Sequence, residues 1–309
     1  MRKRIPAPVD SMGCHVLPPD IVKTNSVASQ NLQILLSLLL SSQTKDQYTF
    51  GSMQALRAHF QPLEITPERI LALDDIDLDR IIKTVGFHAK KTIYMKKISA
   101  LLLGNEFKGK IPTDLDVLVK RFPGIGPKMG ILYLQNAKLY PDDTQDGSTN
   151  EIEYGLAVDT HVLRLSQQFR LVFPPSKGAT TVTPEIARAQ LEKIVPKEHW
   201  KDANPLLVGF GQTVCGARSK MCGDCVIAGT GLCKAEIKSS FNKVKLESNH
   251  MKNEKALTVE STTTDIPPKV RKRKFKAEIS RVLQNFAYTD NLVPDIEDTV
   301  GSRRLRSQK

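Results

Sequence analysis

Residues 122–128 read FPGIGPK and join two segments whose apolar residues recur at helical spacing. Gly124 and Gly126 permit backbone conformations with positive φ and the close approach of another chain. Pro127 is favoured as the first residue of a helix, so Lys128 falls in the first turn of the second helix. Amide groups of such a turn, added to the helix dipole, bind phosphate without reading base sequence. The same glycines also suit a plain junction between packed helices, and both interpretations stay open at this point.

Lys128 and Asp159 are the candidate catalytic residues. The positive end of a helix dipole and partial burial both disfavour an ammonium ion, and the neutral amine is the form that makes a Schiff base. Asp159, in the run AVDTHV (157–162), directly precedes another predicted helix. Aspartate is a favoured N-cap, and a carboxylate at a helix start also serves as an acid–base group facing a cleft. An N-cap for Asp159 and a solvated surface role for Lys128 are the alternatives.

Four of the five cysteines lie close together in the pattern C-x6-C-x2-C-x7-C, and the fifth, Cys14, stands alone. Thiols this close together, in a chain without a recognisable secretory signal, favour a metal centre over disulfides. Tetrathiolate ligation suits either zinc or a [4Fe–4S] cluster, and the spacing does not choose between them. The predicted ligands are Cys215, Cys222, Cys225 and Cys233.

Helical signals cover most of the chain as far as the last of these cysteines, and no alternating strand pattern is found. We predict a central buried helix over 31–41, helices starting at Thr66-Pro67-Glu68 and Thr183-Pro184-Glu185, and an all-α fold. The other predicted helices span 71–84, 90–103, 113–122, 127–139, 162–172 and 200–213. Residues 141–155 are acidic and rich in turn formers, which predicts a surface loop.

The net charge of +12 suits a polyanionic partner but does not establish one. Residues 234–309 carry 17 Lys/Arg and 10 Asp/Glu, a net of +7, which leaves only +5 for the rest of the chain. Most of the charge therefore belongs to a polar segment that we predict to be disordered. No apolar run is long enough to predict a transmembrane helix.

Five runs of the sequence, taken together and in order, resemble the endonuclease III family of DNA glycosylases over residues 30–235. The runs are LLLSSQTKD (38–46), VGFHAKK (85–91), IPTDLDVLVKRFPGIGPK (111–128), AVDTHVLRL (157–165) and FGQTVCGARSKMCGDC (210–225). The resemblance implies a two-lobed fold with a helix–hairpin–helix motif. It implies a six-helix barrel lobe over 27–140, a cluster lobe made of 1–26 and 141–236, and a disordered basic tail over 237–309.

The resemblance also implies a function and a set of site residues. Lys128 would attack the sugar of a damaged nucleotide and cut the strand by β-elimination, with Asp159 assisting. Gln43 would insert into the DNA where the damaged base leaves the stack, and the hairpin with Gly124 and Gly126 would hold the backbone. The implied substrates are oxidised pyrimidines and abasic sites in double-stranded DNA, and the implied cofactor is a [4Fe–4S] cluster in a monomeric enzyme.

Some positions depart from the family pattern. Seven residues separate Cys225 from Cys233 where five are usual, which puts ligation by Cys233 in question. Met129 replaces a common threonine, and His88 replaces a common tyrosine. Three rival functions stay open. The first two are a glycosylase of the same fold that works by hydrolysis alone, against which Lys128 argues, and a non-catalytic DNA-binding protein. An iron–sulfur redox protein is a third, which gives Lys128 and Asp159 no role.

The run PPKVRKRK (267–274) is typical of a nuclear localisation signal. It indicates a eukaryotic protein, and the inserted loops are similar to those of fungal members. We expect a nuclear location, with a mitochondrial one left open, and a tail that merely attracts DNA is the alternative.

Overall fold

The structure of the protein is a computed structural model that describes residues 5–141, 152–176 and 178–237. Most of the predicted acidic loop, the basic run at 267–274 and nearly all of the predicted tail lie outside these residues. Within them the chain forms helices and no strand, and a single isolated bridge joins Cys215 to Lys220. The all-α prediction is confirmed. No helix in these ranges is long and apolar enough to cross a membrane.

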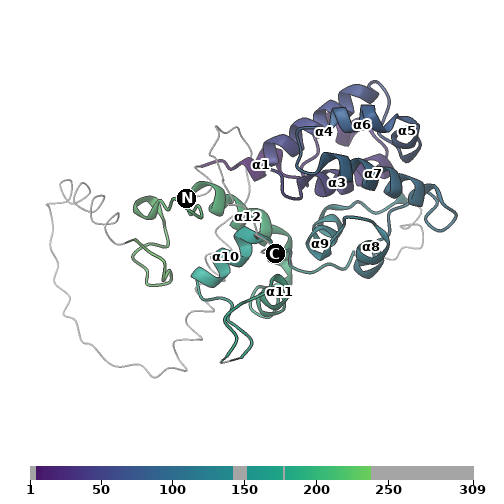
Figure 1. The fold of residues 1–309 in the computed structure, drawn as a ribbon. Coiled ribbons are helices and arrows are strands. Elements are labelled where there is room, and N and C mark those ends of the chain that lie inside the picture. The colour runs from purple at the N-terminus through teal and green to yellow at the C-terminus, as the bar shows by residue number, and fades with distance from the viewer. Residues whose placement is uncertain (1–4, 142–151, 177, 238–309) are drawn as a thin grey trace, which may run out of the picture.

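Figure 1 labels the helices in their order along the chain. Their bounds are α1 Pro8–Met12, α2 Pro19–Thr24, α3 Val27–Ser41, α4 Asp46–Phe60, α5 Pro67–Ala72, α6 Asp75–Ile81, α7 His88–Leu103, α8 Leu115–Arg121, α9 Pro127–Asn136, α10 Thr160–Gln168, α11 Pro184–Leu191 and α12 Trp200–Thr213, with 3₁₀ turns η3 Lys197–His199 and η4 Cys222–Asp224.

Helix α3 is the central element, as the sequence predicts. Every residue from Ser29 to Leu40 is buried, so the helix has no solvent face along most of its length. It begins at Val27, ahead of the predicted start, because the Ser26 hydroxyl accepts a hydrogen bond from the Ser29 amide. Buried polar side chains of this helix have partners in neighbouring segments: Arg57 Nε donates to Gln33 Oε1 over 2.8 Å, and Asn31 Nδ2 donates to the Lys138 carbonyl oxygen over 2.8 Å.

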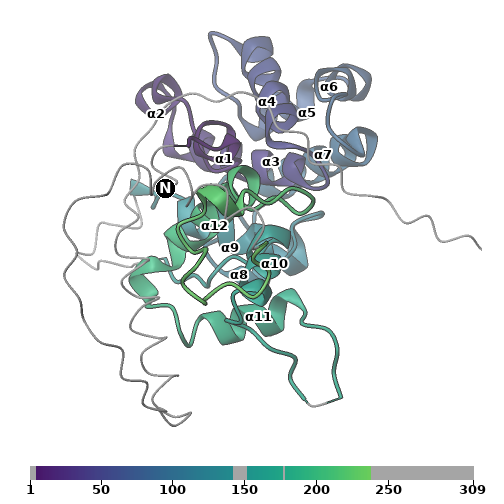
Figure 2. The ribbon, with the colours of Figure 1, turned by 90° about the vertical axis from the view of Figure 1, so that its left-hand side faces the viewer.

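Two main hydrophobic cores organise the helices. Helices α3 to α9 supply most of the larger core, and α10 to α12 together with the segments that flank them supply the second. In Figures 1 and 2 the purple-to-blue helices α3 to α7 gather on one side of the molecule, and α10 to α12 (teal to green) lie on the other. Helix α1 packs against α4 of the first group and α12 of the second. The start of the described chain thus ties the two groups together.

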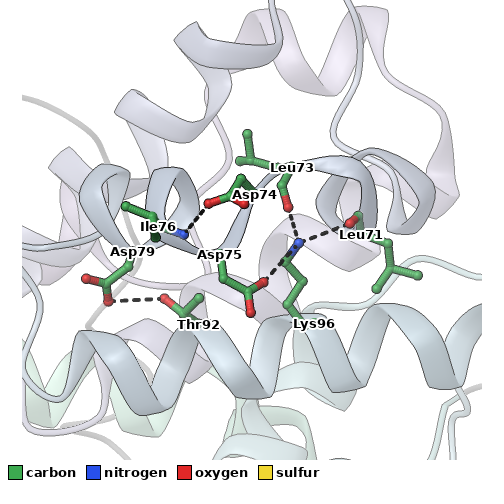
Figure 3. A network of polar contacts seen from close by, with 8 residues as sticks. All are labelled: Leu71, Leu73, Asp74, Asp75, Ile76, Asp79, Thr92 and Lys96. Atoms are coloured by element: carbon green, nitrogen blue, oxygen red, sulfur yellow. Dashed lines mark hydrogen bonds and ion pairs between the residues drawn. The ribbon is translucent and has the colours of Figure 1, made fainter.

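The predicted helix over 71–84 is wrong, because the chain breaks at Leu73 into α5 and α6. Leu73 is extended, and the Asp74 carboxylate caps α6 by accepting from the Ile76 amide over 2.8 Å. Lys96 of α7 donates to the carbonyl oxygens of Leu71 and Leu73 at the end of α5 (Figure 3). Propensity favours one continuous helix, but these capping groups satisfy two separate helix ends.

Other boundaries move by a few residues for the same reason. Thr66 and Thr183 are the predicted N-caps and are confirmed, with their hydroxyls accepting from amides three residues later. Helix α8 begins after Asp114, not at Thr113, because the Asp114 carboxylate caps the Val117 amide over 2.8 Å. Helix α9 starts at Pro127 as predicted and ends at Asn136. Helix α4 lies outside the predicted set, since its mixed composition gives a weak apolar pattern.

Candidate active site

The hairpin between α8 and α9 is a tight turn built on Gly124. Gly124 has φ of +83°, a conformation that is strained for any residue with a Cβ atom. A Cβ atom there would also lie 2.6 Å from the Tyr94 ring and 2.7 Å from a Leu39 methyl group. The turn therefore packs directly on the central helix α3, and this fixes where α9 begins.

Gly126 does not have the positive φ that the sequence suggested for both glycines of the hairpin. It is the N-cap of α9, with φ of −96° and ψ of 175°, so no positive φ requires glycine there. Apart from Gly126 itself and its two chain neighbours, no residue has an atom within 4 Å of the place a Cβ would take. The backbone on this side of the hairpin is open, which leaves room for another molecule to approach the first turn of α9.

Lys128 stands in the first turn of α9, as predicted, and is half-buried. Its positive charge acts on two groups that come from distant parts of the chain, Asp46 at the start of α4 and Cys14 just after α1. Burial raises the pKa of the Cys14 thiol to about 11, against the opposing influence of Lys128. A thiol with this pKa is protonated at neutral pH, so Cys14 is a neutral group in the neighbourhood of the Lys128 amine.

Asp159 is the N-cap of α10, so the predicted capping role is confirmed. Its Oδ1 accepts a hydrogen bond of 2.7 Å from the Val162 amide. The side chain is nevertheless half-buried, and its negative charge acts on Asp46. Lys128 acts on the same carboxylate, so Asp46 links the two candidate catalytic residues electrostatically.

Asp46 and Gln212 are site residues that the sequence analysis missed. Burial raises the pKa of Asp46, while a hydrogen bond from Gln212 and the charges of Lys128 and His161 act in the opposite direction. Gln212 Nε2 donates to Asp46 Oδ2 over 2.8 Å, and its Oε1 accepts from the Val9 amide over 3.1 Å. One glutamine of α12 therefore joins α1 and α4 beside Lys128. Both residues lie in runs already noted, 38–46 and 210–225, but their wide separation along the chain hides the contact.

Gln43 lies in the loop between α3 and α4 and is exposed, with a φ of +50°. Phe87, at the N-cap of α7, is 64% exposed with a φ of +57°. The two are neighbours through Gly86, where a Cβ atom would lie 2.8 Å from the Gln43 carbonyl oxygen. A polar and an aromatic side chain thus project near each other from left-handed backbone. Its left-handed backbone beside Gln43, together with this exposure, is the signal that marks Phe87.

All four cysteines of the predicted cluster line one small, largely apolar cavity, and Cys233 is among them. Gln168 Nε2 and the Ile237 amide each lie 3.4 Å from a sulfur, that of Cys215 and that of Cys222 respectively. No three His, Cys, Asp or Glu side chains in the described ranges are placed to hold a single metal ion. The two extra residues before Cys233 are accommodated in a turn with two glycines in left-handed conformation, Gly229 and Gly231.

Comparison with known protein families identifies the superfamily of this chain. The family model for HhH-GPD superfamily base excision DNA repair proteins matches residues 36–197, more than half of the chain, including the hairpin, Lys128 and Asp159. The chain belongs to the HhH-GPD superfamily. The helix–hairpin–helix that names this superfamily is the α8–turn–α9 unit, so the observed fold agrees with the predicted class.

Endonuclease III proteins of several organisms are relatives of this chain. The endonuclease III homolog 1, chloroplastic, of Arabidopsis thaliana is 38% identical over 259 residues, 82% of this chain and 61% of that protein. The endonuclease III homolog of Encephalitozoon cuniculi is 37% identical over 237 residues, 74% of this chain and 88% of that protein. The chain thus spans less than two thirds of the Arabidopsis protein's length. The resemblance to endonuclease III is confirmed.

A solved structure titled as a non-covalent endonuclease III–DNA complex also matches. It is 25% identical, with a TM-score of 0.55, and the match covers 69% of this chain and 86% of that one.

Proposed function

We propose that this protein is a base-excision repair enzyme that removes oxidised pyrimidines from DNA and cuts the resulting abasic strand. The observation that carries the proposal is the position of Lys128 in the first turn of α9, behind the open backbone of Gly126. Asp46 and Asp159 share its surroundings. The kinship with endonuclease III proteins supports the same activity.

The hairpin and the Gln43 loop are the parts suited to hold DNA. Amide groups in the first turn of α9 lack intrahelical acceptors and point along the positive end of its dipole, which favours a phosphate. Gln43 and Phe87 would fill the space that a base leaves when it turns out of the duplex, since inserted side chains commonly replace lost stacking. The phosphate contact positions the strand, and the damaged base enters the region around Lys128.

The reaction begins when the neutral Lys128 amine attacks C1′ of the sugar. A bond forms between Nζ and C1′ as the bond to the base breaks, and the base leaves with the bonding electrons and takes up a proton. Loss of the amine proton and opening of the sugar ring give a Schiff base. Removal of a proton from C2′ then expels the 3′ phosphate oxygen, and water hydrolyses the imine to free Lys128. Asp159 stabilises the positive charge that develops on the sugar and takes part in proton transfer.

The test of the proposal uses three labelled duplexes: one with a single oxidised pyrimidine, one with an abasic site and one undamaged. We expect base release and strand cleavage on the first, cleavage on the second and neither on the third. Base release without cleavage would instead support the rival hydrolytic glycosylase. Binding to damaged duplexes without either reaction would support a non-catalytic DNA-binding protein.

We also propose that Cys215, Cys222, Cys225 and Cys233 hold a [4Fe–4S] cluster. The four thiols line one cavity with N–H groups directed at two of the sulfurs, which suits thiolate ligands. The cluster would tie the segment after α12 to α10 and so support Asp159 at the start of α10. Purified protein should contain four iron atoms per chain and absorb broadly in the visible range; colourless protein with one zinc would overturn this assignment.

Alanine substitutions at the two hairpin glycines should affect stability and DNA binding separately. Gly124→Ala is expected to lower the free energy of unfolding by about 2 kcal/mol or more, because it combines left-handed backbone with contacts under 3 Å. Gly126→Ala should leave unfolding nearly unchanged and weaken binding to abasic duplex, since its Cβ would occupy only the open side. Denaturant titration and fluorescence anisotropy measure the two effects. Equal losses of stability in both variants would contradict the assignment of the open side.

Asp46→Asn should reduce activity without costing stability at neutral pH. Because burial raises the pKa of Asp46, the folded state disfavours its charge, and the stability of the wild type falls as pH rises through that pKa. The asparagine keeps an oxygen to accept from Gln212. Unfolding of the two proteins should therefore differ in favour of the variant at pH 7 and converge at lower pH, while strand cleavage slows. A variant that is less stable at pH 7 would refute this account.

A further inference from the structure

The loop that carries Gln43 holds an unfavourable conformation. Gln43 is exposed and has a φ of +50°, which residues other than glycine adopt infrequently. Left-handed backbone in a loop persists only where its surroundings enforce it. Contacts to the neighbouring residues Ser42 and Thr44 enforce it here.

Lys91 of α7 supplies most of those contacts. Its Nζ donates to the carbonyl oxygens of Leu40 and Ser42, each over 2.7 Å, and to Thr44 Oγ1 over 3.1 Å. An ammonium group has three hydrogens, and all three are used. The residue is only 3% exposed, and burial lowers the pKa of Lys91 to about 8. Burying a cation is costly, so a lysine in this place is explained by the oxygens it binds.

A second set of contacts holds the loop from the turn before α7. The Gly86 amide donates to Thr44 Oγ1 over 3.0 Å, and the missing Cβ of Gly86 leaves room for the Gln43 carbonyl oxygen. Gln43 is thus flanked on both sides: Ser42 is bound by Lys91, and Thr44 by Lys91 and Gly86. The loop is clamped at both ends while its middle residue projects outward.

Lys96 shows what a simple helix cap on the same helix looks like. It donates to the Leu71 and Leu73 carbonyl oxygens at the end of α5 and pairs with Asp75 over 3.3 Å (Figure 3). Lys91 likewise binds the end of α3, but two of its three acceptors, Ser42 and Thr44, lie beyond that helix and on either side of Gln43. This difference separates a role in the loop from a role in capping alone.

We propose that Lys91 is a positioning residue that holds the Ser42–Thr44 loop in its left-handed conformation, so that Gln43 is ready to enter DNA. This inference rests on the proposed function, because it assigns Gln43 to the space left by an extruded base. Lys91 itself would not touch the DNA, and its contribution would depend entirely on Gln43.

The experiment measures binding to a duplex with an abasic-site analogue opposite 2-aminopurine, whose fluorescence rises when it is unstacked. Lys91→Met should bind about tenfold more weakly than the wild type, because the free loop seldom adopts the left-handed state. Gln43→Ala should weaken binding similarly. The Kd of the double variant should lie within about twofold of the Kd of Gln43→Ala. The two losses should not add, because Lys91 acts only through Gln43. Both single variants should show a smaller 2-aminopurine signal at saturation.

Lys96→Met is the matched control, since it also removes a lysine of α7 that binds carbonyl oxygens at a helix end. It should lower stability while leaving the 2-aminopurine signal at the wild-type level. Lys91→Met should still be trapped by borohydride on an abasic single strand, because Lys128 is unaltered and no stacked partner has to be displaced. Should Lys91→Met fail to fold, Gly86→Ala tests the same loop without disturbing a buried charge, and should give the same loss of signal.

Losses from Lys91→Met and Gln43→Ala that simply multiply in the double variant would overturn the proposal, as would a wild-type signal from Lys91→Met or Gly86→Ala. Wild-type protein that neither binds nor is trapped by abasic DNA would overturn the proposed function instead. Wild-type protein that does both, with Lys91→Met matching it, would remove only the role of Lys91.

Discussion

Lys128→Ala is expected to abolish covalent trapping on abasic DNA and to slow strand cleavage by on the order of 10³-fold or more. The reason is that the proposed reaction passes through a bond between Lys128 Nζ and C1′, and alanine offers no amine. Binding to the abasic duplex should change much less, because the hairpin amides and the Gln43 loop are left in place. The measurement is borohydride trapping with gel separation, beside single-turnover cleavage of the same duplex.

Lys128→Arg is the control that separates charge from nucleophilicity. The guanidinium keeps the positive charge that acts on Asp46 and Cys14, but it stays protonated and does not form a Schiff base. It should bind abasic DNA as the wild type does and still fail to trap. Trapping that persists in Lys128→Ala would show that another amine is the nucleophile, and the assignment of Lys128 would be wrong.

The sequence predicts those parts of the site that depend on neighbours along the chain. The glycines of the hairpin, the position of Lys128 at a helix start and the cap at Asp159 all follow from rules about turns and helix ends. The same rules gave the wrong backbone conformation for Gly126, because a glycine at an N-cap does not need positive φ. They also did not predict the caps that split the helix at Leu73.

Contacts between distant segments were not predictable in this way. Asp46 of α4 meets Gln212 of α12, Cys14 reaches the surroundings of Lys128 from the far end of the chain, and Lys91 of α7 binds the loop between α3 and α4. Nothing local marks these side chains, since aspartate and lysine are ordinary on a surface and a lone cysteine packs as a small apolar residue. The packing of α1 on α4 and α12, and of α4, α7 and α9 on α3, gives them their partners.

The observed cap and the proposed catalytic role of Asp159 can be separated by mutation, and this is the second large effect we expect. The cap on α10 uses one carboxylate oxygen, Oδ1, as a hydrogen-bond acceptor for the Val162 amide. Asparagine has an equivalent oxygen and is an equally good N-cap, but it carries no charge. Asp159→Asn should therefore keep the stability of the wild type, while base release slows by on the order of 10²-fold because nothing offsets the positive charge on the sugar.

Asp159→Ala removes the cap together with the charge. It should lose about 1 kcal/mol of unfolding free energy in addition to the catalytic defect. Asp159→Ser completes the set, since serine caps a helix without a carboxylate and should match Asp159→Asn in both measurements. Thermal unfolding and single-turnover base release on the oxidised-pyrimidine duplex are the two readouts. If activity followed stability across the three variants, so that Asn and Ser kept both, Asp159 would be a structural cap alone. The negative charge that offsets the positive charge on the sugar would then have to come from Asp46.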